Sequence, residues 1–320
     1  MDRERALGVA LIVISACGFG SGALLAKPIY AAGVDWMTLL AWRFLFAALL
    51  SWGWLLLWPA QRRVVRSLSQ RRVLVLVLLG VLYTGNSGTY FAGLETVSAS
   101  LAALIVYLYP AIVAVLSLRF GRRLEGRRAW FGLGLATAGV ALAVGGIDPR
   151  SAPPVLGVLL IAASPLIYAV WIVFAARLGG EQADGAVPPY DSESAGSQDP
   201  ADAGPTAAIM LSATAVAWWI AALVTGRPVM PAQIPVDIWW ALFGIGLVAT
   251  ALALQTFYAG ARRIGAAQAS LVSTVEPVYT IALAALIFGE LLTPIQLAGG
   301  VLVIIGVLIS QTSRSGGREK

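Results

Sequence analysis

Residues 90–110 read YFAGLETVSASLAALIVYLYP, and residues 257–277 read FYAGARRIGAAQASLVSTVEP. The two segments align without a gap at an offset of 167 residues, which matches Pro110 to Pro277. Further along the chain the same offset pairs Gly132 with Gly299 and Gly139 with Gly306. The sequence therefore predicts a duplicated chain, and a duplication of this size determines the architecture of the whole molecule.

The composition indicates that lipid surrounds most of the chain. Of the 320 residues, 59% are hydrophobic and only 12% are charged, and the mean hydropathy is +0.82. Soluble proteins carry about twice that fraction of charged residues. Ten apolar runs are long enough to cross a bilayer, at roughly 20 residues per crossing. They cover residues 6–27, 36–58, 72–93, 97–118, 128–146, 155–176, 206–225, 237–260, 267–288 and 294–311.

Five spans fall in each half, and an odd number forces the second copy to insert upside down relative to the first. The loop charges agree with this arrangement. With the N-terminus in the cytoplasm, the inner segments hold 18 Lys and Arg residues and the outer segments hold three, Lys27, Arg150 and Arg227. This is a strong positive-inside signal. The predicted fold is an all-α integral membrane protein, with ten transmembrane helices as two inverted five-helix repeats.

The same reading predicts the domain boundaries. The first repeat and its five helices fall within residues 1–176, and the second repeat begins with the sixth helix at about residue 155. Residues 206–311 hold the rest of the second repeat, and residues 312–320 form a cytoplasmic tail. Residues 177–205 are expected to be an acidic, disordered cytoplasmic linker, because from residue 179 they contain six acids and neither Lys nor Arg. The linker is either a plain spacer or a regulatory tether.

The residue types present exclude several kinds of site. Cys17 is the only cysteine, so no internal disulfide forms, and the absence of His removes the commonest metal ligand and general base. The sequence contains no Gly-rich phosphate loop, Cys/His cluster or Ser/His/Asp set. The net charge of +6 comes from Arg residues in short loops, which is typical of membrane topology rather than of nucleic-acid binding. We expect no catalytic residue, metal, cofactor or nucleic-acid partner.

Motifs near both ends resemble those of a known family. The C-terminal set resembles the signature of EamA-type transporters, in the drug/metabolite transporter superfamily: Glu276-Pro277, Phe288-Gly289-Glu290, Leu292-Thr293-Pro294, Gln296, Gly299-Gly300 and Gly306. Lys27 and Arg43-Phe44 match the N-terminal part of that pattern. Many relatives carry Trp-Gly in the first span, where this chain has Gly18-Phe19-Gly20. The resemblance implies a ten-helix, inverted-repeat transporter, often an exporter of amino acids, metabolites or drugs.

Glu276 is the only acid predicted near the middle of the membrane. Ser273, Tyr279 and Thr280 share its helix face, and a polar stripe on an apolar helix is expected to face the bundle interior. Ionisable groups are costly at that depth and are usually functional or paired. Glu276 is therefore a proton-coupling carboxylate, a counter-charge for a cationic group, or a structural carboxylate bonded to a neighbouring helix near Pro277.

Arg43 is expected in the outer half of the second span. It either binds a substrate carboxylate through its planar guanidinium group or pairs with an acid and fixes the bundle. Lys27 lies near the outer interface, where we expect it to extend to water. The remaining candidates share helix faces within single spans and either line a polar, aromatic cavity or join helices: Tyr83, Asn86 and Tyr90; Ser100 and Tyr107; Tyr168 and Trp171; Gln255 and Tyr258.

The sequence thus favours a secondary transporter, a proton-linked exporter of small organic metabolites that works by alternating access. Its expected partners are a small solute, the lipid bilayer and protons, in a bacterial inner membrane with both termini cytoplasmic. The alternatives are an uptake or exchange carrier and a non-transporting membrane scaffold or sensor, and a homodimer stays open. The expected substrate-binding or coupling residues are Glu276, Arg43, Tyr83, Asn86, Tyr90, Tyr107, Tyr168, Trp171, Gln255, Tyr258 and Ser273.

Overall fold

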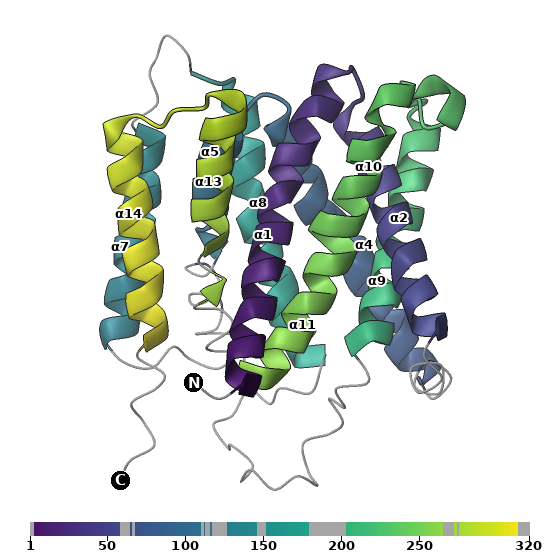
Figure 1. The fold of residues 1–320 in the computed structure, drawn as a ribbon, viewed down its shortest axis with the longest axis horizontal. Helices are drawn as coiled ribbons and strands as arrows, with labels where there is room; N and C mark the ends of the chain where they lie inside the picture. Colours follow the sequence, from purple (N-terminus) through teal and green to yellow (C-terminus); the bar gives the residue numbers. More distant parts are fainter. Residues whose placement is uncertain are drawn as a thin grey trace, which may run out of the picture.

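The helices stand side by side and roughly parallel to one another in the computed structural model (Figure 1). The structure describes residues 3–57, 65, 68–109, 112, 116, 127–145, 152–178, 203–264, 272–273 and 275–312. All regular elements in these ranges are helices, and no strand occurs among them. Five of these described helical segments are apolar and long enough to cross a membrane: Ala6–Ala31, Trp36–Leu57, Gln70–Leu94, Gly204–Val224 and Val236–Phe257.

The element order follows the predicted apolar runs closely. The first half contains α1 (Arg3–Ala31), α2 (Trp36–Leu57), α4 (Gln70–Leu94), α5 (Ala99–Val106) and α7 (Arg127–Gly145). The second half contains α8 (Val155–Leu178), α9 (Ala203–Val224), α10 (Trp239–Gly246), η4 (Leu247–Leu252), α11 (Ala253–Ile264), α13 (Val275–Phe288) and α14 (Pro294–Thr312). The all-helical membrane fold is confirmed. The count of ten spans stays a prediction, because parts of the runs 97–118 and 267–288 lie outside the described residues.

The predicted linker and tail fall mostly outside the described residues, which end at Leu178, resume at Ala203 and end again at Thr312. Within the described ranges, short polar signals set the helix ends. Asp35 accepts hydrogen bonds from the backbone N–H groups of Met37 and Thr38 at the start of α2. Such caps satisfy N–H groups that have no partner inside the helix.

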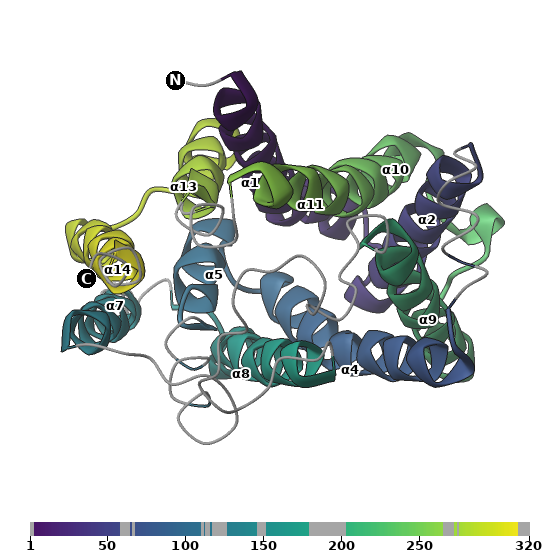
Figure 2. The ribbon, with the colours of Figure 1, turned by 90° about the horizontal axis from the view of Figure 1, so that it is seen from below.

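Helices from the two halves pair by the offset that relates the two sequence copies. Both α2 and α9 contain 22 residues and begin 167 residues apart, and they pack against each other. Both α7 and α14 contain 19 residues, begin 167 residues apart, and pack together at one edge of the bundle (Figures 1 and 2). A Cβ on Gly139 would lie 2.6 Å from the carbonyl oxygen of Gly299, and one on Gly299 would lie 2.5 Å from that of Gly139. These glycines permit close helix packing.

The contacts between α4 and α8 recur between α11 and α1. A Cβ on Gly93 of α4 would contact the carbonyl oxygen of Gly157 and the side chain of Ile161. A Cβ on Gly260 of α11 would contact the same groups of Gly8 and Ile12. Gly260 follows Gly93 by 167 residues, and Gly157 and Ile161 both follow their counterparts by 149. The two halves therefore use equivalent surfaces against each other.

The second copy carries one extra residue, and it lies in η4. Two equivalent contacts show this. A Cβ on Gly80 of α4 would contact the carbonyl oxygen of Met210, and a Cβ on Gly246 of α10 would contact that of Arg43. Met210 follows Arg43 by 167 residues, but Gly246 follows Gly80 by only 166. Beyond η4 the offset is 167 again, so one residue is inserted where the helix widens into a π-helical turn. Turns of this kind are rare and are frequent at functional sites.

Candidate functional site

Arg43 of α2 is buried against the π-helical turn, with 7% of its surface exposed. Its Nε donates to Thr250 Oγ1 at 2.8 Å, and its Nη2 donates to the carbonyl oxygen of Ala249 at 3.4 Å. The guanidinium carbon lies 4.7 Å from the ring centroid of Phe91 and 5.3 Å from that of Phe44. No carboxylate of the described residues lies within ion-pair distance of Arg43. Neutral acceptors and ring faces therefore hold this charge.

Glu276 lies in the first turn of α13, against the end of α5. The Tyr107 hydroxyl is 3.4 Å from Glu276 Oε2 and donates to the carbonyl oxygen of Ser273 at 3.1 Å. The hydroxyls of Ser21 and Tyr279 are 3.0 Å apart and connect α1 to the same helix. Within the described part of the chain, no Lys or Arg lies within ion-pair distance of Glu276. Glu276 is thus bonded across the two halves by a neutral phenol only.

Gly20 allows α1 to approach α13 beside Glu276. A Cβ on Gly20 would lie 2.5 Å from Thr280 Oγ1 and 3.3 Å from the carbonyl oxygen of Glu276. A side chain at this position would require the side chains of Thr280 and Tyr279 to move. The sequence motif Gly18-Phe19-Gly20 drew attention to this segment, but it carried no information on which helix it meets.

Six aromatic side chains form a continuous row, here called the aromatic wall: Tyr107, Tyr109, Tyr168, Trp171, Tyr83 and Phe44. Ring centroids are 6.1 Å apart for Tyr107 and Tyr109, and 5.2 Å apart for Tyr109 and Tyr168. Tyr83 lies 6.5 Å from Tyr168 and 6.1 Å from Phe44. Edge-to-face contacts at such spacings are favourable.

The aromatic wall extends from the partly buried Glu276 to the buried Arg43. Tyr107 at one end contacts Glu276, and Phe44 at the other contacts Arg43. Tyr83 contacts Phe44 and Tyr90 contacts Phe91, the two rings that lie over the Arg43 guanidinium group. The rings come from α2, α4 and α8 and from the segment that follows α5. In Figure 2, α4 and α8 lie on the side of the bundle opposite α1 and α11.

The remaining sequence candidates have other placements. Asn86 accepts from the Ser164 hydroxyl at 2.8 Å, so it joins α4 to α8. Gln255 Nε2 is buried without a hydrogen-bond partner among the described residues. Ser273 contributes its carbonyl oxygen to Tyr107. The Tyr258 side chain lies outside the described residues. The structure therefore brings Arg43, Glu276, Tyr83, Tyr107, Tyr168 and Trp171 into one connected set.

Sequence reasoning missed Tyr109, Phe44 and Phe91. Tyr109 was overlooked because the run 97–118 was treated as one helix, on which Tyr107 and Tyr109 point to different faces. In the structure α5 ends at Val106 and a turn follows, so both rings join the aromatic wall. The signal was available in Pro110, because a proline inside a helix removes a backbone hydrogen bond to the residue four positions earlier, which here is Val106.

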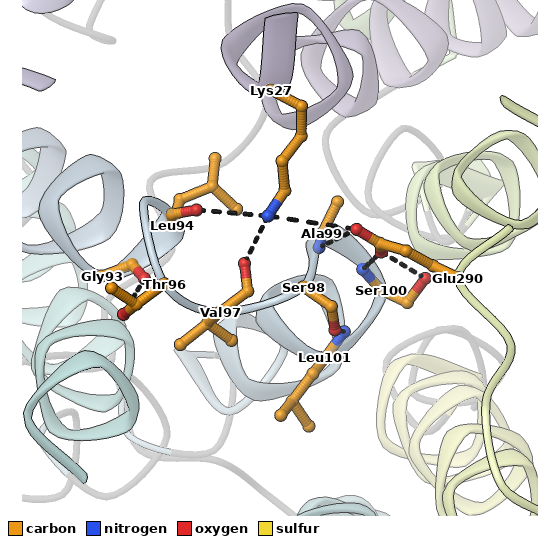
Figure 3. Close-up of polar contacts among 10 residues, drawn as sticks. All are labelled: Lys27, Gly93, Leu94, Thr96, Val97, Ser98, Ala99, Ser100, Leu101 and Glu290. Atoms are coloured by element: carbon orange, nitrogen blue, oxygen red, sulfur yellow. Dashed lines mark hydrogen bonds and ion pairs between the residues drawn. The ribbon is translucent and has the colours of Figure 1, made fainter. Parts of the chain in front are cut away.

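A second set of charges lies at the other end of α5. Figure 3 shows Lys27 extending from α1 to the turn between α4 and α5. Its Nζ donates to the carbonyl oxygens of Leu94 at 3.3 Å and Val97 at 2.7 Å, and lies 4.0 Å from Glu290 Oε1. The Lys27 side chain is 22% exposed, so protein acceptors hold its charge beside whatever water reaches it. Its charge binds carbonyl oxygens at and just beyond the end of α4, where a helix favours cations.

Glu290 binds the opposite kind of helix end. Its carboxylate accepts from the backbone N–H groups of Ala99 and Ser100 at 3.3 and 3.1 Å, and from the Ser100 hydroxyl at 3.2 Å (Figure 3). These are the first residues of α5, whose N–H groups have no partner inside the helix. The helix dipole favours a negative charge there. Lys27 and Glu290 therefore tie α1 and the segment after α13 to a single turn.

Comparisons with known proteins agree with the membrane fold. The sequence profile described as the EamA-like transporter family matches residues 6–145 and 202–312. The "Uncharacterized transporter YyaM" of Bacillus subtilis is 25% identical over 272 residues, which cover 84% of this chain and 82% of that protein. An "Uncharacterized transporter" of Archaeoglobus fulgidus is 25% identical over 303 residues, 95% of this chain and 96% of its own.

One solved structure, titled "Crystal structure of protein", superposes with a TM-score of 0.61 at 17% identity. The match covers 96% of both chains. At this level of identity the likeness concerns the fold alone.

Proposed function

Because the chain belongs to the EamA-like transporter family, we propose that it is a secondary transporter that exports a small organic solute in a proton-linked cycle. Family membership makes it a multi-pass membrane transporter of small molecules and implies a role other than catalysis. The observation that carries the finer proposal is a pair of charges, the buried Arg43 and the partly buried Glu276, that contact one aromatic wall and have no ionic partner among the described residues.

The proposed architecture is two inverted repeats of five spans, with the second beginning at about residue 155. It is supported by the equivalent contacts of Gly93 with α8 and Gly260 with α1, and by the matched pairs α2–α9 and α7–α14. Repeats of this kind place a solute site between the halves, and rocking of one half against the other exposes it to each side in turn. Tyr107 and Glu276 come from different halves, so their contact is expected to change in that motion.

In the proposed cycle, Glu276 holds a proton on one side of the membrane and releases it on the other. A carboxyl group that loses hydration inside a bundle exchanges its proton with whichever face is open. Arg43 remains charged throughout, because guanidinium groups do not deprotonate in proteins. Proton movement is therefore assigned to Glu276, where a cationic group of the solute would take the place of the proton, and the rest of the solute is assigned to Arg43 and the aromatic wall.

Reconstitution tests this proposal. Metabolites that accumulate in cells lacking the protein, and fall in cells overproducing it, provide the candidate solutes. Purified protein in vesicles should then move such a solute when a pH gradient is imposed. Flux that ignores the gradient would refute proton linkage, and solute binding without any flux would indicate a scaffold or sensor.

The proposed orientation has its own test. Both termini and the segment 177–205 are placed in the cytoplasm of a bacterial cell, on the evidence of the loop charges. Cys17 is replaced by Ser, and single cysteines are introduced at Ser192 and Asp148. A membrane-impermeant thiol reagent added to intact cells should label position 148 and leave position 192 unlabelled. The opposite pattern would invert the orientation.

A further inference from the structure

Arg43 and Glu276 are opposite charges at the two ends of one aromatic wall, yet they do not pair with each other. We propose that the solute itself carries both complementary charges: an anionic group that binds Arg43, a cationic group that binds Glu276, and a planar or apolar body between them that lies along the wall. This inference rests on the proposed transport function and specifies its solute. It differs from a simple α-amino acid, in which the two charges are joined through a single carbon atom.

The Arg43 end is suited to a carboxylate or another flat anion. Arginine has five N–H donors in a fixed plane, and Arg43 has hydrogen bonds from Nε to Thr250 and from Nη2 to Ala249. The donors that remain can bind two oxygens at once. Phe91 and Phe44 lie against the guanidinium group and hold its plane without neutralising its charge.

The Glu276 end is suited to an ammonium group. An ionised carboxylate has about four acceptor positions, and the described residues supply one donor, the Tyr107 hydroxyl at 3.4 Å. Tyr107 continues directly into Tyr109 and Tyr168, whose rings are within 6.1 and 5.2 Å of their neighbours. A cation close to aromatic faces gains an attraction that adds to the carboxylate contact.

The depth of the two charges implies an extended solute. Trp36 at the start of α2 and Phe288 at the end of α13 lie on the same side of the bundle, the side of Lys27 and Glu290. Along its helix, Arg43 is seven residues from Trp36, and Glu276 is 12 residues from Phe288. At 1.5 Å per residue, their backbones lie about 10 and about 18 Å from this side of the bundle. The backbone positions of the two residues thus differ in depth by about 8 Å and lie on different helices, which favours a solute whose two charges are separated.

Four probes of similar size test the inference on the full chain in lipid nanodiscs. In 4-(aminomethyl)benzoate the two charged groups lie at opposite ends of a ring. The analogues 4-ethylbenzoate and 4-methylbenzylamine each lack one charge, and phenylalanine has both charged groups attached to a single carbon atom. We expect 4-(aminomethyl)benzoate to bind roughly tenfold more tightly than each of the other three, since a charge-assisted hydrogen bond is worth at least that factor.

Variants assign the charges. Arg43→Gln should weaken binding of 4-ethylbenzoate and leave that of 4-methylbenzylamine unchanged, and Glu276→Gln should do the reverse. Arg43→Lys, which keeps the charge near Thr250, covers the case in which Arg43→Gln does not fold, and should weaken 4-ethylbenzoate less. Arg227→Gln, which removes a half-exposed charge near Asp35, is the matched control and should change none of the affinities.

The outcomes separate this inference from the proposed function. If 4-(aminomethyl)benzoate does not bind, or binds no more tightly than its one-charge analogues or phenylalanine, the inference is overturned. If the charge pattern holds but no solute crosses a vesicle membrane, the site stands and the transport function fails. If a solute with a single charge is transported and its flux is insensitive to Arg43→Lys, transport stands and the inference fails.

Discussion

Two pairs of opposite charges lie in this bundle, and they differ in whether the two members of the pair contact each other. Lys27 and Glu290 are 4.0 Å apart, and each also binds backbone groups at the turn between α4 and α5. Arg43 and Glu276 bind only neutral groups among the described residues and lie at opposite ends of the aromatic wall.

A charge inside a membrane protein is costly unless it is compensated. The charges of Lys27 and Glu290, here called the outer pair, are compensated by each other and by helix ends. The charges of Arg43 and Glu276, here called the inner pair, have only neutral partners among the described residues, which is the arrangement expected where a proton or a charged solute binds. The comparison therefore indicates a structural role for Lys27 and Glu290, and it supports the proposed role of Arg43 and Glu276 in transport.

The largest effect is expected at Glu276. Glu276→Gln keeps the shape and the contact with Tyr107 but cannot bind or release a proton. Accumulation driven by a pH gradient in vesicles should fall to the level of empty vesicles, while exchange of labelled for unlabelled solute persists. If Glu276 were structural like Glu290, Glu276→Gln would transport normally and only Glu276→Ala would be damaging. Unchanged gradient-driven flux in Glu276→Gln would remove the coupling role.

The next effect compares the two cations directly. Arg43→Ala should lower solute transport by roughly tenfold or more, because hydrogen bonds between charged groups contribute about 1.5–3 kcal/mol. Lys27→Ala should lower it much less, since Lys27 binds only backbone oxygens and Glu290 in the described structure. Initial rates at matched protein levels in the membrane decide the order. Equal rates for wild type and Arg43→Ala would exclude Arg43 from the site.

The outer pair should affect stability instead. Glu290→Gln weakens three hydrogen bonds at the start of α5 and should lower the free energy of unfolding by about 1–2 kcal/mol. Its coupling to Lys27, measured by a double-mutant cycle with Lys27→Met, should be below about 1 kcal/mol, because the two groups are 4.0 Å apart and partly exposed. Unfolding in detergent measures both quantities. A coupling of several kcal/mol would show that the pair is a strong bridge between the halves.

The contrast between the two pairs also marks what the sequence could and could not predict. Apolar length alone placed the second span at 36–58 and the tenth at 294–311, against α2 at Trp36–Leu57 and α14 at Pro294–Thr312. The polar stripe over residues 273–280 drew the prediction to Glu276, and in the structure Tyr107 contacts this residue from the other half. These properties belong to one helix at a time, and periodicity reports them reliably.

Contacts between distant segments were not predictable in this way. The carbonyl oxygens that bind Lys27 are 67 and 70 residues away, and no local pattern indicates that they face it. The extra residue in η4 escaped notice because the clearest repeat, 257–277, begins after it. That one residue creates the π-helical turn to which Arg43 is bonded.

The smallest effect should come from that turn. Thr250→Val keeps the volume of the side chain but removes the oxygen that accepts from Arg43 Nε and the hydroxyl that donates to Ile245 at 3.1 Å. The guanidinium group would then be held by Ala249 and the rings alone, so we expect the KM for the solute to rise several-fold with kcat little changed. Thr256→Val is the matched control, because its hydroxyl bonds only to carbonyl oxygens of Leu252 and Ala253 in the described structure. Both variants lose one hydroxyl from the continuous helical segment formed by η4 and α11. A rise in KM confined to Thr250→Val would therefore show that the turn orients Arg43 for binding. Equal behaviour of the two variants would mean that Phe91 and Phe44 suffice to orient it, and that the extra residue serves packing against α2.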